Sequence, residues 1–229
     1  MALNAAKEKG NVGGGKRPEP LEAANYLARV VQIVDLGIQE QRPYQGVDKP
    51  PAHEIMLSYE LGTEFMKDEE GNDLPDKPRW ISESFVLHNL KADLAKSTKR
   101  AKAIDSKGGL QGDFAAMGGF PCTVTVVQSL SKKGDGVVYN NVGNVTPPMK
   151  GVPVPELVND VKVFDLDEPD LEVFFSLPEW IQDKVKGNLE FNGSALQGLL
   201  AGANPPEKKE KNEKPAPQKE EEEGDDNPF

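Results

Sequence analysis

Aromatic residues with cations close beside them are the feature of this sequence best suited to binding chemistry. Trp80 follows Lys77 and Arg79, and in an extended strand it shares a face with Ser82 and Ser84. An indole on such a polar face needs a reason to be exposed. Aromatic rings stack on the bases of single-stranded nucleic acid, and lysine and arginine contact its phosphates. Trp80 and its two cations are therefore the leading candidates for a site of this kind.

A second ring and a second pair of cations extend the candidate set. Tyr44 lies in a loop between Arg42 and Lys49, which repeats the combination of an aromatic ring with cations. Lys132 and Lys133 lie in a turn between two predicted strands, within the glycine-rich run SKKGDG that is typical of a hairpin. These loops place positive charge where a phosphate backbone would pass.

Two further tyrosines are ambiguous. Tyr59 shares a strand face with Ile55 and Leu57, so core packing explains it as well as base stacking does, and Tyr139 fits either environment. The complete set of candidate nucleic-acid-binding residues is Tyr44, Tyr59, Lys77, Arg79, Trp80, Lys132, Lys133 and Tyr139.

The residues that usually carry catalysis or bind metals are few and scattered. His53 and His88 lack cysteine partners and any HExxH-like spacing, and Cys122 is interpreted as a buried, unreactive thiol. Residues 10–16 have the spacing of a phosphate-binding loop, but Arg17 replaces the Ser or Thr that would bind magnesium, and no strand precedes the loop. We therefore expect no enzyme activity, no cofactor and no metal.

The net charge of −11 is unevenly distributed along the chain. Residues 1–150 hold 19 basic and 19 acidic side chains, residues 151–204 hold 3 and 10, and residues 205–229 hold 5 and 9. Because nucleic-acid-binding domains are usually basic, the total charge argues against that function. The neutral first part nevertheless leaves room for a groove that is cationic locally.

The elements that would position these residues predict a mainly β fold. Five strands are expected, at residues 26–39, 54–61, 80–88, 123–130 and 137–145. Gly37, inside the first strand, indicates a bend or a bulge. Residues 67–77 are expected to form a charged connecting loop, and residues 89–107 a helix with a basic face, which is either a second cationic patch or simply solvated.

Five strands with a helix between the third and the fourth is the order of the OB-fold, a small and partly open barrel. A ferredoxin-like fold would need a helix between the first two strands, where this chain has a proline-containing loop. We divide the chain into a flexible N-terminal arm at 1–20, an OB-fold domain at 21–150, an extension at 151–204 and a disordered acidic tail at 205–229.

The extension begins with a proline-rich strap and is expected to contain a helix at residues 176–186, with Pro178 in its first turn. Trp180, Ile181 and Val185 form the apolar stripe of that helix. Because the extension is too short to fold alone, we expect it to pack on the barrel or on a neighbouring subunit, and the second arrangement would allow self-association.

The tail is rich in Lys, Glu and Pro and ends on an aromatic residue that carries the terminal carboxylate. Its glutamate run is able to compete for a cationic groove, and its tip fits an apolar pocket with a basic rim on a partner protein. A purely solubilising tail would not need an aromatic end. The residues of the tip are Asp225, Asp226, Asn227, Pro228 and Phe229.

This tip, DDNPF, resembles the acidic C-terminal end of bacterial single-stranded DNA-binding proteins, which typically is Asp-Asp-Asp-Ile-Pro-Phe. Phage single-stranded DNA-binding proteins also join an OB-fold to an acidic tail that ends in Phe. The chain looks more like this divergent phage group, in which a segment similar to residues 163–186 follows the barrel. Asn227 stands where the usual tip has Ile, which removes an apolar contact with the pocket of a bacterial partner.

The resemblance implies sequence-tolerant binding of single-stranded DNA in phage replication, recombination or repair, with replication or recombination proteins recruited by the tip. Two alternatives stay open: an acidic protein–protein adaptor or DNA mimic that acts through residues 151–229, and an RNA-binding OB protein. No apolar run is long enough to span a membrane and no signal peptide is recognised, so we expect a cytoplasmic protein, in the host cytoplasm if the chain is phage-encoded.

Overall fold

The computed structural model describes residues 18–202. Most of the predicted N-terminal arm, the phosphate-loop-like residues 10–16 and the whole of the predicted tail at 205–229, with its tip, lie outside the described residues.

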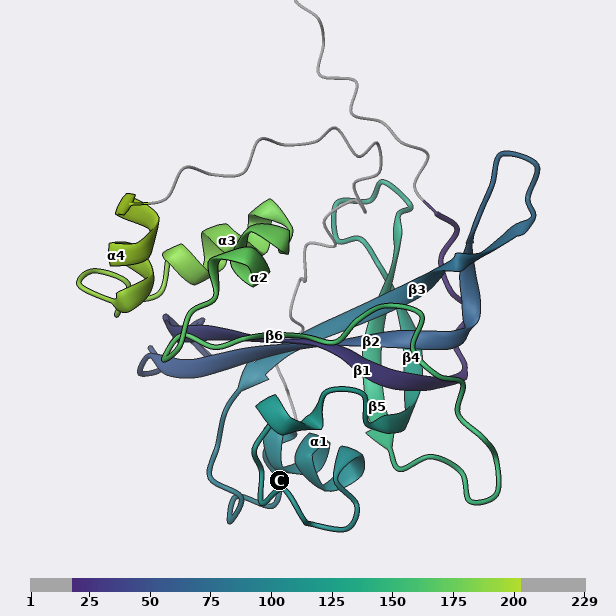
Figure 1. Ribbon diagram of the computed structural model, residues 1–229, viewed down its shortest axis with the longest axis horizontal. Coiled ribbons are helices and arrows are strands. Elements are labelled where there is room, and N and C mark those ends of the chain that lie inside the picture. Colours follow the sequence, from purple (N-terminus) through teal and green to yellow (C-terminus); the bar gives the residue numbers. More distant parts are fainter. Residues whose placement is uncertain (1–17, 203–229) are drawn as a thin grey trace, which may run out of the picture.

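The centre of the molecule is an antiparallel sheet that curls strongly into an open half-barrel (Figure 1). Its strands follow one another in the spatial order β3-β2-β1-β4-β5. β1 therefore pairs with β2 along one edge and with β4 along the other, while β3 and β5 approach each other across the opening. The bounds are Asn25–Gln39 for β1, Ala52–Lys67 for β2, Asp73–Val86 for β3, Pro121–Leu130 for β4 and Val138–Thr146 for β5.

Irregularities in β1 bend the sheet. The register with β2 shifts between Val30 and Gln32 and again between Asp35 and Gly37. Gly37 has a φ of +73°, which residues with a Cβ adopt only with strain. A bulge kinks its strand and increases the local twist, so these two positions explain much of the curl. The bulge predicted at Gly37 is confirmed.

The hairpin formed by β2 and β3 is longer than the sequence pattern predicted. Phe65 pairs with Pro78, and Met66 pairs with Leu74, so the two strands continue through most of the expected loop. The remaining turn is closed by Asp68, whose carboxylate accepts hydrogen bonds from the backbone N–H groups of residues 70 and 72 at 2.9 and 2.8 Å. The prediction of a loop over residues 67–77 was therefore wrong for all but this turn.

The predicted helix at 89–107 is also shorter, because α1 covers only Lys96–Ile104. The preceding residues form turns, the first of which is closed by the Asn89 side chain. α1 lies below the sheet in Figure 1 and fills the mouth of the half-barrel with Ala101 and Ile104. A short 3-10 turn, η2 (Ala115–Met117), follows in the connection to β4.

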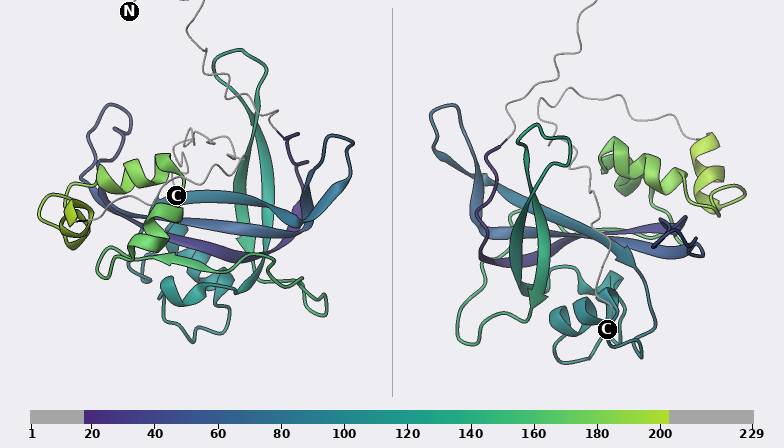
Figure 2. Two further views of the ribbon diagram at one scale, coloured as in Figure 1. Left: turned by 45° about the horizontal axis from the view of Figure 1, so that its top comes forward. Right: turned by 180° about the vertical axis from the view of Figure 1, so that it is seen from behind.

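The sheet has an apolar cluster on each face. We call the face that meets α1 the inner face; its buried side chains include Leu57, Tyr59, Ile81 and Val124. The opposite, outer face carries Val34, Leu36 and Met56, which pack against the C-terminal segment. In Figures 1 and 2 the helices α2 and α3 lie on the outer side of the sheet, away from α1.

The C-terminal segment consists of one short strand and three helices. β6 (Lys162–Phe164) runs parallel to β1 beside residues 32–34, and α2 (Leu171–Ser176), α3 (Glu179–Lys186) and α4 (Ala195–Gly202) follow. The helix predicted at 176–186 corresponds to α3, which begins later, at Glu179, because the chain is extended at Leu177 and Pro178, and Pro178 is its N-cap. α2, which ends at Ser176, was not predicted. Ile181 and Val185 are buried as their apolar stripe predicted.

Close contacts at two glycines hold this segment, and residue 155 ahead of it, on the sheet of the same chain. A Cβ at Gly37 would lie 2.8 Å from Asn188, and one at Gly62 would lie 2.7 Å from Pro155. Such distances are too short for real carbon contacts, so both glycines are needed for the approach. Lys184 of α3 also pairs with the buried Glu54 of β2 at 2.9 Å.

Candidate nucleic-acid interface

The side chains of β3 alternate between the two faces of the sheet. Ile81, Glu83 and Phe85 point into the inner core, which leaves Trp80 and Ser82 on the outer face. Ser82 shares a hydrogen bond of 2.9 Å with a serine of β2, and Trp80 is half-buried. The structure thus places the indole on the polar strand face that the sequence predicted.

The edge of the Trp80 ring is fixed by a buried carboxylate. The indole Nε1 donates a hydrogen bond of 3.1 Å to Glu60, which is directly opposite on β2. Glu60 also accepts hydrogen bonds from the backbone N–H of Val158, at 2.6 Å, and from the side chain of Asn159, at 2.7 Å. We call these four residues the Glu60 cluster. It joins β2, β3 and the strap, residues 147–161, on the outer face.

The two cations expected beside Trp80, Lys77 and Arg79, are not both found next to the indole. Arg79 has the strand parity of Ile81, so it belongs to the other face. It is half-buried; burial lowers its pKa, and the nearby charges of Glu64 and Tyr26 oppose that shift. Lys77 is half-buried nearer the turn. Arg79 is therefore separated from the indole by the sheet, against the sequence-based pairing of the two.

Tyr44 and its lysine do come together. The β1–β2 loop is closed by reciprocal backbone hydrogen bonds of 2.9 Å between Tyr44 and Val47. The Lys49 ammonium lies 4.9 Å from the centroid of the Tyr44 ring, a distance typical of a cation–π contact. The ring is half-buried, and Gln45 donates a hydrogen bond of 3.2 Å to its hydroxyl.

The turn between β4 and β5 presents Lys132 and Lys133 to solvent. A backbone hydrogen bond of 2.8 Å from Ser131 to Val137 closes the turn. Asp135 accepts a hydrogen bond from the Val137 N–H, and this contact lowers the pKa of its carboxyl. These hydrogen bonds order the turn, which presents two exposed cations with the carboxylate of Asp135 close by.

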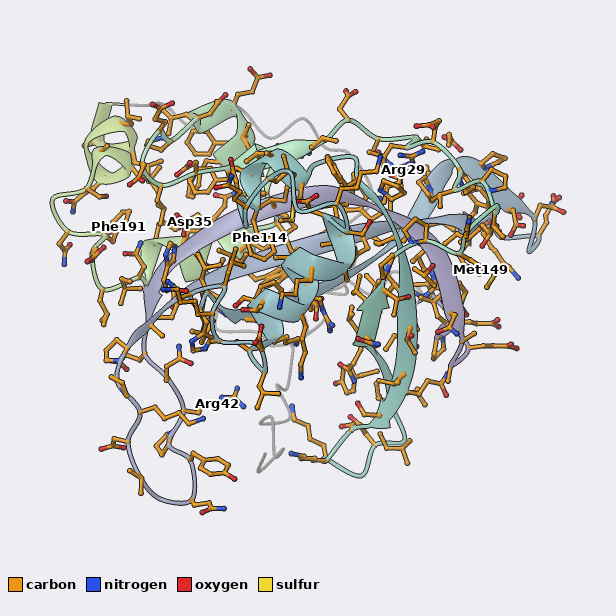
Figure 3. The ribbon with its side chains drawn as sticks, turned by 90° about the horizontal axis from the view of Figure 1, so that it is seen from below. Arg29, Asp35, Arg42, Phe114, Met149 and Phe191 are labelled. Carbon is orange, nitrogen blue, oxygen red and sulfur yellow. The ribbon has the colours of Figure 1, made fainter. Side chains whose placement is uncertain are left out.

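The β1–β2 loop and the β4–β5 hairpin extend from the sheet toward the same side of the molecule (Figures 2 and 3). Arg42, labelled in Figure 3, extends from the first of these loops on the side that faces the hairpin. Cationic and aromatic side chains from two connections that are distant in the sequence are therefore found on one side of the fold.

The two ambiguous tyrosines have different environments. Tyr59 is fully buried, and its hydroxyl donates a hydrogen bond of 2.8 Å to Glu83. Burial is the main cause of the strong rise in its pKa. A ring with no exposed surface cannot stack on a base, so Tyr59 is a core residue and we withdraw it from the interface. Tyr139 is half-buried on β5, opposite Ser129.

Three cations of the helix that offered a second basic patch are paired with carboxylates of the protein. Arg100 is buried and donates hydrogen bonds to Glu83 at 2.7 and 3.1 Å, and Lys96 pairs with the same carboxylate at 3.2 Å. Lys102 pairs with Asp93 at 2.6 Å. Because α1 also lies on the inner side of the sheet, we do not include its lysines in the candidate interface.

Glu60 and the strap were missed by sequence reasoning. Glu60 is an acidic residue in an alternating strand, for which solvation is the usual explanation, and its strap partners lie 98 and 99 residues away in the chain. The one available signal was that Glu60 and Trp80 belong to adjacent strands of a hairpin.

Comparisons of the chain with protein-family models, with curated protein sequences and with solved structures find no match. Within residues 18–202, no helix has the length and apolar character needed to cross a bilayer, and no group of three or more His, Cys, Asp and Glu side chains is placed to hold a metal ion.

Proposed function

We propose that this chain is a sequence-tolerant single-stranded DNA-binding protein of the phage type, built on an OB-fold and used in DNA replication, recombination or repair. The strand order, with β1 pairing both β2 and β4 and a helix between β3 and β4, supports the OB-fold assignment. OB-folds bind oligonucleotides on the face of strands 2 and 3 and with the loops β1–β2 and β4–β5.

One observation carries the proposal: the half-buried indole of Trp80 is fixed on the outer face of β3 by a hydrogen bond to Glu60. In the proposed complex Trp80 stacks on a base, and stacking on an aromatic ring contributes about 1–3 kcal/mol per base. Tyr44, with Lys49 over its ring, provides a second aromatic platform on the β1–β2 loop.

Lys132 and Lys133 contact phosphates in the proposed complex, from the β4–β5 hairpin, and Tyr139 lies at the base of that hairpin. Lys77 remains a candidate at the edge of this surface. Arg79 is a weaker candidate than the sequence suggested, because it belongs to the other face of β3.

The tail has two tasks in this proposal. Its acidic run competes with DNA for the cationic surface, and its tip, with Pro228 and Phe229, recruits partner proteins. A protein that carries its own competing anion does not need to be basic overall, which reconciles the net charge of −11 with binding of a polyanion.

A titration of labelled oligonucleotides tests the proposal. We expect tight binding to single-stranded DNA, weaker binding to the duplex, and a linear fall of log K with log salt concentration. The double variant Lys132→Ala, Lys133→Ala should reduce that salt slope by about 1.4, because each phosphate contact on a single strand contributes about 0.7. An RNA of the same sequence tests the choice between the two nucleic acids.

The matched control is the double variant Lys99→Ala, Lys107→Ala, which removes the same charge from exposed positions on and after α1. It should leave the slope unchanged. If both double variants change the slope equally, only the net charge matters and the hairpin is not part of the site. If the chain binds no single strand even after deletion of residues 220–229, the adaptor or DNA-mimic alternative replaces the proposal.

A further inference from the structure

The buried carboxylate of Glu60 does more than support the fold. We infer that Glu60 is a positioning residue, which sets the orientation of the Trp80 indole and fixes the strap beside it. As a result, Val158 of the strap belongs to the DNA-binding surface. This inference rests on the function proposed above.

The contacts of Glu60 account for its burial, since only 3% of the residue is exposed. Oε1 accepts the backbone N–H of Val158 at 2.6 Å, and Oε2 accepts the Trp80 indole at 3.1 Å. Asn159 adds its side-chain amide at 2.7 Å and its backbone N–H at 3.3 Å. A carboxylate removed from water needs such donors, and these four are all uncharged. The negative charge therefore holds three segments together through uncharged donors, and Arg29, which lies opposite Glu60 in the strand register, makes its own hydrogen bonds to the strap.

The hydrogen bond to Glu60 does not itself cover a face of the indole. The hydrogen bond uses the N–H at the edge of the ring, whereas stacking uses the ring face. Because the edge is bound to Glu60, the side chain is held in one orientation before any ligand arrives. A ring ordered in advance loses less conformational entropy on binding, which increases affinity without any new contact.

The strap is fixed beside the ring at two points. Arg29 of β1 donates hydrogen bonds to the carbonyl groups of Pro155, at 2.8 Å, and Val154, at 3.2 Å. Glu60 holds the next residues, Val158 and Asn159. The Val158 side chain is apolar and 52% exposed, although its backbone and Trp80 bind the same carboxylate. An apolar contact of this kind does not read base edges, which fits a sequence-tolerant surface.

The experiment uses the full chain with Trp180→Phe, so that the fluorescence reports Trp80, the other of the two tryptophans. Glu60→Ala, Trp80→Ala and the double variant are compared in this background for binding of an oligothymidine. We expect Glu60→Ala to weaken binding about tenfold, within the range that stacking contributes. Only a small further loss, from the released strap at Val158, is expected when Trp80 is already Ala. The salt slope should stay unchanged because no phosphate contact is lost.

A second readout follows Trp80 in the absence of DNA. Quenching by acrylamide should increase in Glu60→Ala, because the ring is no longer held against the strap. Glu60→Gln keeps one carbonyl acceptor and should give intermediate values of both affinity and quenching. Asn159→Ala removes only one donor, and it provides a mild variant that still shows increased quenching if Glu60→Ala folds poorly.

The outcomes separate this inference from the proposed function. Equal losses of affinity on Glu60→Ala with and without Trp80 would show a general structural role and overturn the inference. If Trp80→Ala leaves affinity unchanged, the proposed surface is wrong. In that case unchanged acrylamide quenching in Glu60→Ala and Asn159→Ala would overturn the positioning role as well, and increased quenching would preserve it.

Discussion

Two buried carboxylates on neighbouring strands, Glu60 on β2 and Glu83 on β3, are held in opposite ways. Both have at most 4% of the residue exposed. Glu83 lies in the inner core and binds Arg100, Lys96 and the hydroxyl of Tyr59, so its charge is balanced by cations. Glu60 lies on the outer face and binds uncharged N–H donors. We call Glu83, its partners Arg100, Lys96 and Tyr59, and Asn144 the Glu83 cluster.

The different partners of Glu83 and Glu60 indicate that the two carboxylates have different roles. Arg100 links Glu83 on β3 with Asn144 on β5, at 3.3 Å, and so connects α1 to the two strands that border the opening of the half-barrel. The Glu83 cluster thus stabilises the fold by joining β3, β5 and α1 at the opening of the half-barrel. The same environment affects Cys122, since burial and the nearby Glu83 raise the pKa of its thiol to about 12. The Glu60 cluster instead ends at a surface, where it holds the half-buried ring of Trp80.

The largest effect is expected from breaking the Glu83 cluster. Arg100→Ala leaves a buried carboxylate without its main partner, and losses of this kind cost about 3–5 kcal/mol. Urea unfolding should show this loss of stability. Lys102→Ala is the matched control, because it removes an exposed ion pair from the same helix and should leave the unfolding midpoint almost unchanged. Equal effects of the two substitutions would mean that Arg100 does not close the fold.

A smaller effect is expected on the outer face. Gly62→Ala places a Cβ 2.7 Å from Pro155 and must push the strap away from β2. Overpacking of this kind costs about 1–3 kcal/mol. In the Trp180→Phe background it should also increase acrylamide quenching of Trp80, because the strap partners of Glu60 move with Pro155. The measurements are the free energy of unfolding and the Stern–Volmer constant.

Gly109→Ala is the control for that substitution, since a Cβ at Gly109 meets nothing within 4 Å. It should change neither stability nor quenching by a comparable amount. A Gly62→Ala chain whose Trp80 quenching equals that of the parent would show that the strap does not determine the environment of the ring.

Much of the fold could be predicted from local patterns, because alternation of apolar residues reports which face of a strand is buried. The five strands and the outward direction of Trp80 follow from that period. The helix between the third and the fourth strand was also predicted, although α1 is shorter than expected. Gly37 marked its bulge for the same local reason, since a glycine is favoured where φ is positive.

The candidate site was predictable only in part, because its geometry depends on contacts between residues far apart in the chain. Arg100 has the pattern of an exposed basic helix face, and only the approach of β3 shows that it serves the core. Tyr59 fitted two environments until Glu83 was placed beside its hydroxyl. Arg79 and Trp80 are neighbours in the sequence, and the same alternation that exposes one turns the other to the opposite face.

The most direct test of the central claim is the fluorescence of Trp80 itself during binding of single-stranded DNA. In the Trp180→Phe chain, oligothymidine should quench the remaining tryptophan in a saturable way, with the same midpoint as an independent binding signal such as fluorescence anisotropy of the labelled strand. If the strand binds by anisotropy while the Trp80 emission stays constant through saturation, the outer face of β3 is not the binding surface and the account is contradicted.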